Sequence, residues 1–168
     1  MILLSSMLVL LSGCGGIIDA INDALKNGIF VSDTEYVLND NSNIVSDIDV
    51  DTNIVSLTKV NVIVSIDHDN DSDLIFYLKS PNNTMIILSN HNGTNDNLGY
   101  TITFKDDADE SITNGIKPHI TEYIPEGPLS SFNDENPDGI WTLYVYDTVN
   151  NAQTGKLNGW SLWIQGTK

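Results

Sequence analysis

Apolar and polar residues alternate along several stretches of this chain, with the period of two that marks a β-strand with one buried face. Such alternation predicts a strand over residues 60–67, a second over residues 141–146, and a third over residues 160–165. The side chains predicted to face the core of these strands are Val60, Val62, Val64, Ile66, Trp141, Leu143, Val145, Trp160, Leu162 and Ile164.

A β-hairpin is predicted between the first two of these strands. Residues 73–79 and 84–89 are rich in residues that favour strands, and the sequence Ser80-Pro81-Asn82-Asn83 separates them. Proline presets the backbone of a turn, and asparagine tolerates the left-handed region that tight turns use. The connection before the last strand is expected over residues 148–159.

No long helical period follows residue 28, and many short strands are separated by turns rich in Asn, Gly and Pro. This pattern predicts an all-β domain, a sandwich or jelly roll, over residues 29–168. Trp163 lies on the opposite face of its strand from Trp160, so it is the candidate for an exposed contact surface.

The N-terminus has the character of a targeting segment. The apolar run Ile2–Leu11 is too short to span a membrane, which takes about 20 residues. It ends in Leu11-Ser12-Gly13-Cys14, which resembles a bacterial lipobox with Cys14 as the site of lipidation. We therefore expect residues 1–14 to be a lipoprotein signal peptide, with an ordinary signal peptide and a chance cysteine as the alternative.

Residues 15–28 are expected to form a tether, in which the spacing of Ile17, Ile18, Ile21 and Leu25 predicts a short amphipathic helix. A lipid-anchored protein of this kind would lie in the cell envelope, on a membrane or the cell surface, facing away from the cytoplasm.

Charge excludes one class of partner. The chain has 23 acidic residues against seven lysines, no arginine, and a formal net charge of −16. Nucleic acid requires a basic face, so it is excluded as a partner. An acidic chain of this kind is suited to solubility outside the cell and to cation binding.

Calcium is the cation that the pattern favours. Asp67, Asp69, Asp71 and Asp73 occupy every second position of one predicted loop, and Ca²⁺ takes six to eight oxygen ligands. The loop is not an EF-hand, because its sixth and twelfth positions are Ser72 and Leu78. We expect a structural Ca²⁺ site in which three acidic residues join two from this loop: Asp71, Asp73, Asp106, Asp107 and Glu110.

Two alternatives remain open for these acidic residues: a solvated acidic loop, and a transition-metal site that uses His68. The histidines His68, His91 and His119 have no recognisable metal spacing and are interpreted as loop or surface residues. Asp147 follows a predicted core strand and is expected to hold a turn by hydrogen bonding.

Several stretches together resemble the P domain (P/Homo B domain) of proprotein convertases, the module C-terminal to subtilisin-like serine proteases. The most specific is the pair GIWTLYVYD and TGKLNGWSL, residues 139–147 and 154–162. The matching stretches, in family order, are Ile66–Leu74, Tyr77–Thr84, Thr103–Ala108, Tyr123–Phe132, Gly139–Asp147 and Thr154–Leu162. Asn83 departs from the family by replacing the usual turn glycine.

The resemblance implies a jelly-roll-like β-sandwich or barrel of about eight strands, of the galactose-binding-like kind. It also implies a non-catalytic role in which the module stabilises a subtilisin-like protease and tunes its response to calcium and pH. No Gly-x-Ser-x-Gly elbow is present and an all-β domain leaves no room for a subtilisin-type fold, so we expect no enzyme activity.

Two partner classes follow from this interpretation. The first is a protein, such as a protease, bound by a module that Cys14 anchors to a membrane. The alternative is a calcium-dependent adhesin or glycan-binding jelly roll. An unrecognised hydrolase is the least favoured of the functions considered.

Overall fold

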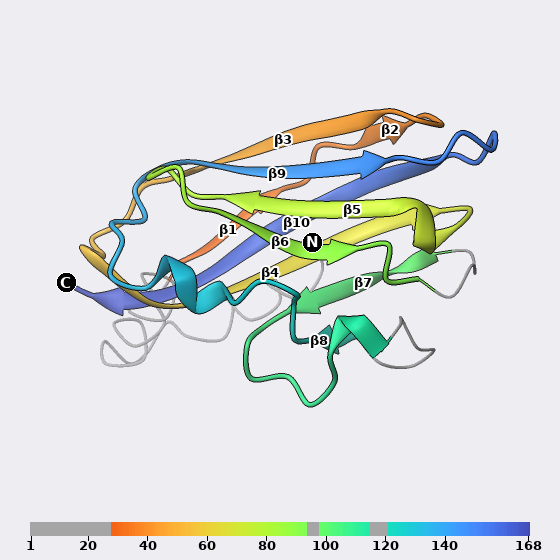
Figure 1. The fold of residues 1–168 in the computed structure, drawn as a ribbon. Coiled ribbons are helices and arrows are strands. Elements are labelled where there is room, and N and C mark those ends of the chain that lie inside the picture. The colour runs from red at the N-terminus through yellow and green to blue at the C-terminus, as the bar shows by residue number, and fades with distance from the viewer. Residues whose placement is uncertain (1–27, 94–97, 115–120) are drawn as a thin grey trace, which may run out of the picture.

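The structure, a computed structural model, describes residues 28–93, 98–114 and 121–168. These residues form ten strands and three short 3₁₀ helices (Figure 1). The strands are β1 (Ile29–Ser32), β2 (Tyr36–Leu38), β3 (Asn43–Val50), β4 (Ser56–His68), β5 (Leu74–Lys79), β6 (Met85–Asn90), β7 (Leu98–Phe104), β8 (Glu122–Tyr123), β9 (Gly139–Asp147) and β10 (Gly155–Thr167). The 3₁₀ helices are η1 (Asp71–Asp73), η2 (Ile112–Asn114) and η3 (Leu129–Phe132).

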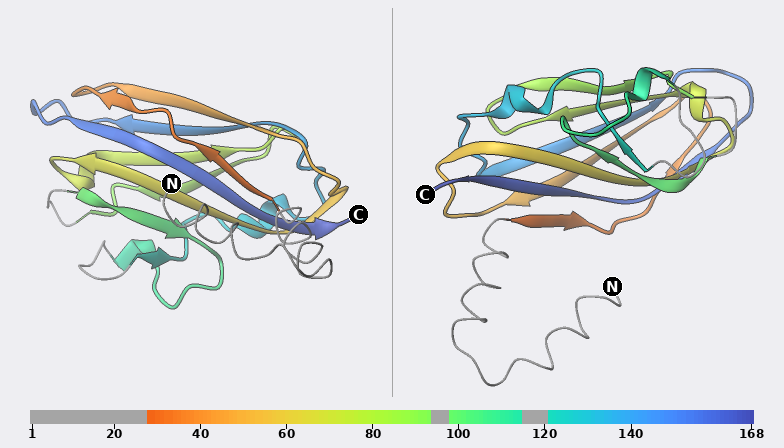
Figure 2. Two further views of the ribbon diagram at one scale, coloured as in Figure 1. Left: turned by 180° about the vertical axis from the view of Figure 1, so that it is seen from behind. Right: turned by 90° about the horizontal axis from the view of Figure 1, so that it is seen from below.

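Two sheets pack face to face as a sandwich, which confirms the predicted fold class (Figures 1 and 2). The six-stranded sheet has the order β1-β10-β4-β7-β8, with β2 also paired to β10. The four-stranded sheet has the order β3-β9-β5-β6. All pairs are antiparallel except β7 with β8. The strand order also shows that most neighbours in a sheet, such as β4 and β10, are distant in sequence.

Alternation along the strands produces the core. The inward positions predicted for β4, β9 and β10 are all buried, and the two sheets close over them. Trp141 is fully buried, its indole Nε1 donates to the carbonyl of Pro137 at 2.9 Å, and its ring meets Phe132 edge-on at 5.0 Å. Trp160 is buried as well, and its Nε1 donates to Ser46 Oγ at 2.9 Å across the core. Both tryptophans therefore serve the core, as predicted.

The predicted hairpin is confirmed by the pairing of β5 with β6. The backbone N–H of Asn83 donates to the carbonyl of Ser80 at 3.0 Å, and that of Ser80 donates to the carbonyl of Thr84 at 2.9 Å. Asn83 has a φ of 68°, in the left-handed region. Asparagine tolerates this conformation better than most side chains, so it can stand where the family usually has glycine.

The expected connection over residues 148–159 is partly wrong, because β10 begins at Gly155. The register shifts between Leu157 and Gly159, where β10 passes through a bulge. Gly159 has a φ of 155°, and a Cβ there would lie 2.8 Å from the carbonyl oxygen of Ser32. The turn-forming Asn158-Gly159 pair thus marks a bulge within a strand. The short strands β1, β2 and β8 carry too few residues for alternation to reveal them.

No helix in the described part of the chain is long and apolar enough to cross a membrane. The predicted signal peptide, Cys14 and nearly all of the predicted tether lie outside the described residues.

We predict that Trp160→Ala lowers the free energy of unfolding by about 3–5 kcal/mol, because it opens a cavity and leaves Ser46 without its indole partner. Trp163→Ala is the matched control: the same residue type in the same strand, half-buried on the outer face. Its cost should be much smaller. Urea unfolding of the purified full chain measures both, and equal losses would contradict the assignment of the two faces.

Candidate functional site

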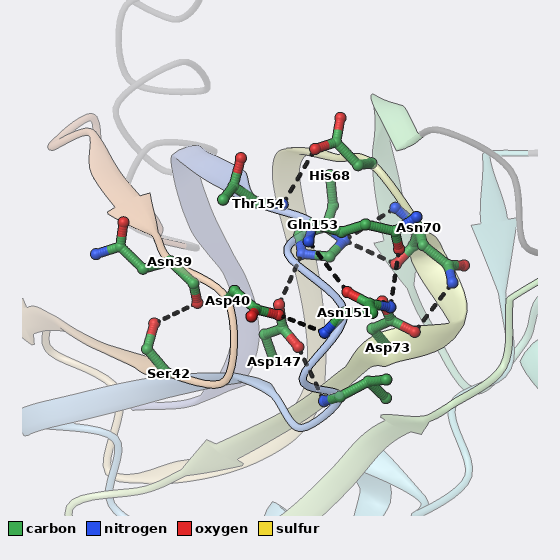
Figure 3. A network of polar contacts seen from close by, with 12 residues as sticks. Asn39, Asp40, Ser42, His68, Asn70, Asp73, Asp147, Asn151, Gln153 and Thr154 are labelled. Atoms are coloured by element: carbon green, nitrogen blue, oxygen red, sulfur yellow. Dashed lines mark hydrogen bonds and ion pairs between the residues drawn. The ribbon is translucent and has the colours of Figure 1, made fainter.

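Loops from distant parts of the chain meet at one end of the sandwich and form a network of polar side chains (Figure 3). The loop after β4 leads through η1 into β5, while the loop after β9 returns to the start of β10. The pairing of His68 with Gly155 places these two loops side by side. We call this set the acidic end, defined by its residues Asp40, His68, Asp69, Asn70, Asp71, Asp73, Asp147 and Asn151.

A buried contact between a histidine ring and a carboxylate lies at its centre. His68 Nε2 lies 3.2 Å from Asp147 Oδ2, and neither side chain is exposed to solvent. The other ring nitrogen of His68, Nδ1, lies 2.7 Å from the carbonyl oxygen of Asn70. Asp147 Oδ1 accepts from the backbone N–H of Val149 at 3.0 Å, which is the turn-holding bond predicted for it. The expectation that His68 lies in a loop or at the surface is wrong, because it closes β4 at a buried position.

Asp73 joins the two loops. Its Oδ1 accepts from Asn70 Nδ2 at 3.0 Å and its Oδ2 accepts from Asn151 Nδ2 at 2.8 Å (Figure 3). The residue is 3% exposed, so these amide donors replace the water that a carboxylate would otherwise bind. Asp73 therefore acts as a clamp between η1 and the loop before β10.

Two further carboxylates hold backbone at the same end. Asp69 Oδ2 accepts from the N–H of Thr154 at 3.1 Å, and Asp40 Oδ1 accepts from the N–H of Asn151 at 3.0 Å. Both bonds join segments more than eighty positions apart in sequence. The acidic residues of this end thus stabilise the meeting of the loops.

Asp71 is also buried, at 3% exposure. Gly93 packs directly on it: a Cβ on Gly93 would lie 2.1 Å from Asp71 Oδ1 and 2.2 Å from the N–H nitrogen of Ser72. Only glycine fits in this position without displacing the loop. Since Asp71 and Asp73 are both buried, the alternative of a solvated acidic loop does not describe them.

The other predicted calcium ligands lie elsewhere. In the register of β4 with β7, His68 faces Leu98 while Val62 faces Phe104. Asp106 and Asp107 follow Phe104, whereas Asp71 and Asp73 follow His68, which separates the two groups by about 20 Å along the strand. The predicted convergence of all five residues is therefore wrong. Among the residues the structure describes, no group of three or more Asp, Glu, His or Cys side chains is arranged to hold a metal ion.

Asp106, Asp107 and Glu110 have structural partners where they lie. Asp106 accepts from the N–H groups of Leu129 and Ser130, at 2.8 and 2.7 Å, and so holds the start of η3. Glu110 Oε1 accepts from Asn114 Nδ2 at 2.6 Å. Asp107 Oδ2 accepts from Lys59 Nζ at 2.7 Å, and this hydrogen bond lowers the pKa of the Asp107 carboxyl.

Trp163 is half-buried on the outer face of the six-stranded sheet, opposite the core, as its position in the alternation predicts. It pairs with Ile29 in β1, and Lys59 Nζ lies 5.7 Å from the centre of its ring. Lys59 thus contacts both Trp163 and Asp107.

Sequence reasoning missed three contributors to the acidic end: Asp40, Asn70 and Asn151. Each is a polar residue in a loop, and the chain has many of these. The signal that could have drawn attention to Asn70 is its place inside the acidic run, where its amide donates to Asp73 and its carbonyl meets His68.

In this all-β sandwich, β9 carries the sequence of residues 139–147, and β10 carries that of residues 154–162 from Gly155 onward. This combination defines the class of the protein as a P-domain-type β module. The chain belongs to the proprotein convertase P-domain family, whose sequence model matches residues 57–164. No curated protein matches it.

A solved structure shows the same fold. The serine protease of Aeromonas sobria is 19% identical to this chain, with a TM-score of 0.50 over 83% of it. The complex of that protease with the chaperone ORF2 gives 20% identity and a TM-score of 0.49 over the same share. In each comparison this chain covers 27% of the protease chain. At this identity the likeness concerns the fold alone.

We predict that Asp73→Asn destabilises the fold by about 2 kcal/mol, because an amide donor replaces a buried acceptor and faces the donor of Asn70 or Asn151. Thermal unfolding should show a fall in Tm of about 5 °C. Asp107→Asn is the control, since its exposed ion pair with Lys59 should matter little. A fall in Tm for Asp107→Asn as large as for Asp73→Asn would contradict the clamp.

Proposed function

We propose that this protein is a non-catalytic P-domain module that binds and stabilises a protein partner, a subtilisin-like protease, at a membrane. The observation that carries the proposal is the family match over residues 57–164, which spans most of the sandwich. P domains act beside subtilisin-like catalytic domains, so a protease is the partner that the family favours.

The polar network supports a structural role for its histidine. A serine nucleophile needs a histidine base within hydrogen-bond reach, with a carboxylate behind it. His68 and Asp147 supply the histidine and the carboxylate of that arrangement. However, His68 Nε2 faces Asp147 Oδ2 and Nδ1 faces the carbonyl oxygen of Asn70, so neither ring nitrogen faces a serine. The pair is also completely buried, so substrate would have no access to it.

Membrane attachment through a lipid on Cys14 is part of the proposal. It rests on the lipobox-like sequence before Cys14. Two or more acyl chains on one cysteine give stable attachment, since each buried methylene contributes about 0.8 kcal/mol. The module would then be displayed in the cell envelope, facing away from the cytoplasm.

The expected result in the cell that makes the protein is that the full chain and a subtilisin-like protease sediment together with membranes. Cys14→Ser should release both into the soluble fraction, and deletion of the chain should shorten the half-life of the protease. Cell fractionation and a pulse-chase measurement test these points. A Cys14→Ser chain that still sediments with membranes contradicts the anchor, and an unchanged protease half-life contradicts the stabilising role.

Calcium binding stays a prediction, now confined to Asp71 and Asp73 at the acidic end. Five of the eight residues that define the acidic end are aspartates, so a cation would relieve their mutual repulsion. Ca²⁺ that binds the folded chain and not the unfolded chain raises the free energy of unfolding by linkage.

We expect millimolar Ca²⁺ to raise the Tm of the full chain by several degrees relative to excess chelator. Asp71→Asn should abolish the difference, while the control Asp107→Asn should keep it. Identical unfolding curves with calcium and with chelator would show that the acidic end binds no calcium. Hydrogen bonds alone would then stabilise it.

A further inference from the structure

The outer face of the four-stranded sheet carries a group of tyrosines that the core does not use. In β9, Tyr144 and Tyr146 alternate with the buried Leu143 and Val145, so both point away from the core. In β5, Tyr77 alternates with buried neighbours in the same way. All three tyrosines are half-buried.

Strand register places these rings in contact. Tyr144 pairs directly with Tyr77 across β9 and β5. The rings of Tyr144 and Tyr146 are nearly parallel, at 9°, with centroids 6.4 Å apart, and Tyr77 meets Tyr146 edge-on at 6.1 Å. The three side chains therefore support one another in fixed orientations, which lowers the entropy lost when a partner binds them.

Apolar side chains extend the tyrosine group across the whole sheet. One row of paired residues runs Val45, Tyr144, Tyr77, Ile87 through all four strands. Val45 is 47% exposed, and Met85 and Ile140 on the same face are each 49% exposed. We call this surface the tyrosine face: Val45, Ile75, Tyr77, Met85, Ile87, Ile140, Tyr144 and Tyr146.

Carboxylates border the tyrosine face. Asp47 and Asp49 of β3 point outward beside it, Asp51 and Asp138 lie beyond one end of the strands, and Glu126 lies against β6 through its bond with the N–H of Asn90. All five of these residues are exposed. Lys79 is the one lysine among the four strands of this sheet.

From strand spacing, the face measures about 15 Å by 20 Å, roughly 300 Å². A stable protein interface takes about 800 Å² from each partner. A partner that covers the face must therefore also cover the carboxylates that border it. Its own border has to be basic, because burying unpaired carboxylates is costly.

We propose that the tyrosine face is the docking surface for the protein partner, and that this partner presents an apolar patch surrounded by lysine or arginine. The proposal rests on the proposed function and names the surface through which it acts. Aromatic side chains at the centre and charges at the margin are the usual arrangement of a protein interface.

The same charges disfavour a second copy of this chain as the occupant. Two tyrosine faces brought together would oppose Asp47 and Asp49 with identical acidic borders, in a chain whose net charge is already −16. A neutral glycan could stack on the rings, but it would leave the acidic border without a counterpart.

Site-specific photocrosslinking in the cell that makes the protein tests the surface. The full chain carries p-benzoylphenylalanine at Tyr144 in one variant and at Trp163, on the opposite sheet, in the control. We expect a protein adduct from position 144 and none of that protein from position 163. The adduct partner, once purified, should bind the unmodified full chain directly.

Binding measurements with that purified partner then test two points: the contact made by the tyrosines, and the attraction between the carboxylates and a basic border on the partner. Tyr77→Ala/Tyr144→Ala should weaken binding at least about tenfold, while Tyr144→Phe and Trp163→Ala should retain it. Asp47→Asn/Asp49→Asn should slow association at low salt, and raising the salt should weaken binding to the unmodified chain. All these side chains lie outside the core, so each variant should fold. Far-UV circular dichroism and thermal unfolding check that it does.

Several results would overturn the proposal: no adduct from position 144, an adduct made of glycan or of a second copy of the chain, or binding that neither the alanines nor salt affects. An adduct with a protease from position 163 alone would overturn the tyrosine face but keep the proposed function. A partner that binds through position 144 but is not a protease would keep the tyrosine face and overturn the proposed function.

Discussion

The pairing of β4 with β10 is the constraint on which the rest of the structure depends. Each strand has 13 residues, and they pair along almost their whole length in the middle of the six-stranded sheet. Every second residue is buried from Val60 to His68 in β4 and from Trp160 to Ile164 in β10, so this one pair of strands supplies much of the core. At its far end the pairing sets His68 against Gly155, and this brings together the loops that form the acidic end.

Burial explains why the acidic end is built as it is. Taking Asp73 and Asp147 out of water is costly unless donors replace the lost hydration. Amides of Asn70 and Asn151, the ring of His68 and the N–H of Val149 provide those donors. The network fixes where the loops cross, so its hydrogen bonds stabilise the fold at this end of the sandwich.

The sandwich buries one face of each sheet and leaves the other for partners. Its two outer faces differ in chemistry: Trp163 lies beside Lys59 on one, whereas the tyrosine face on the other has carboxylates around it. This asymmetry gives the module two distinguishable surfaces. The proposed function assigns the partner to one of these two surfaces, and the packed interior keeps both of them rigid.

The sequence by itself determined the fold class, the family, the core positions of β4, β9 and β10, and the β5–β6 hairpin, because alternation and turn residues are local signals. It also placed Trp163 outside the core. Only the tertiary structure decided that Asp71 and Asp73 lie away from Asp106 and Asp107 along β4, that His68 is buried against Asp147, and that Tyr77 joins Tyr144 and Tyr146. These facts depend on strand register between segments far apart in the chain, which no local pattern specifies.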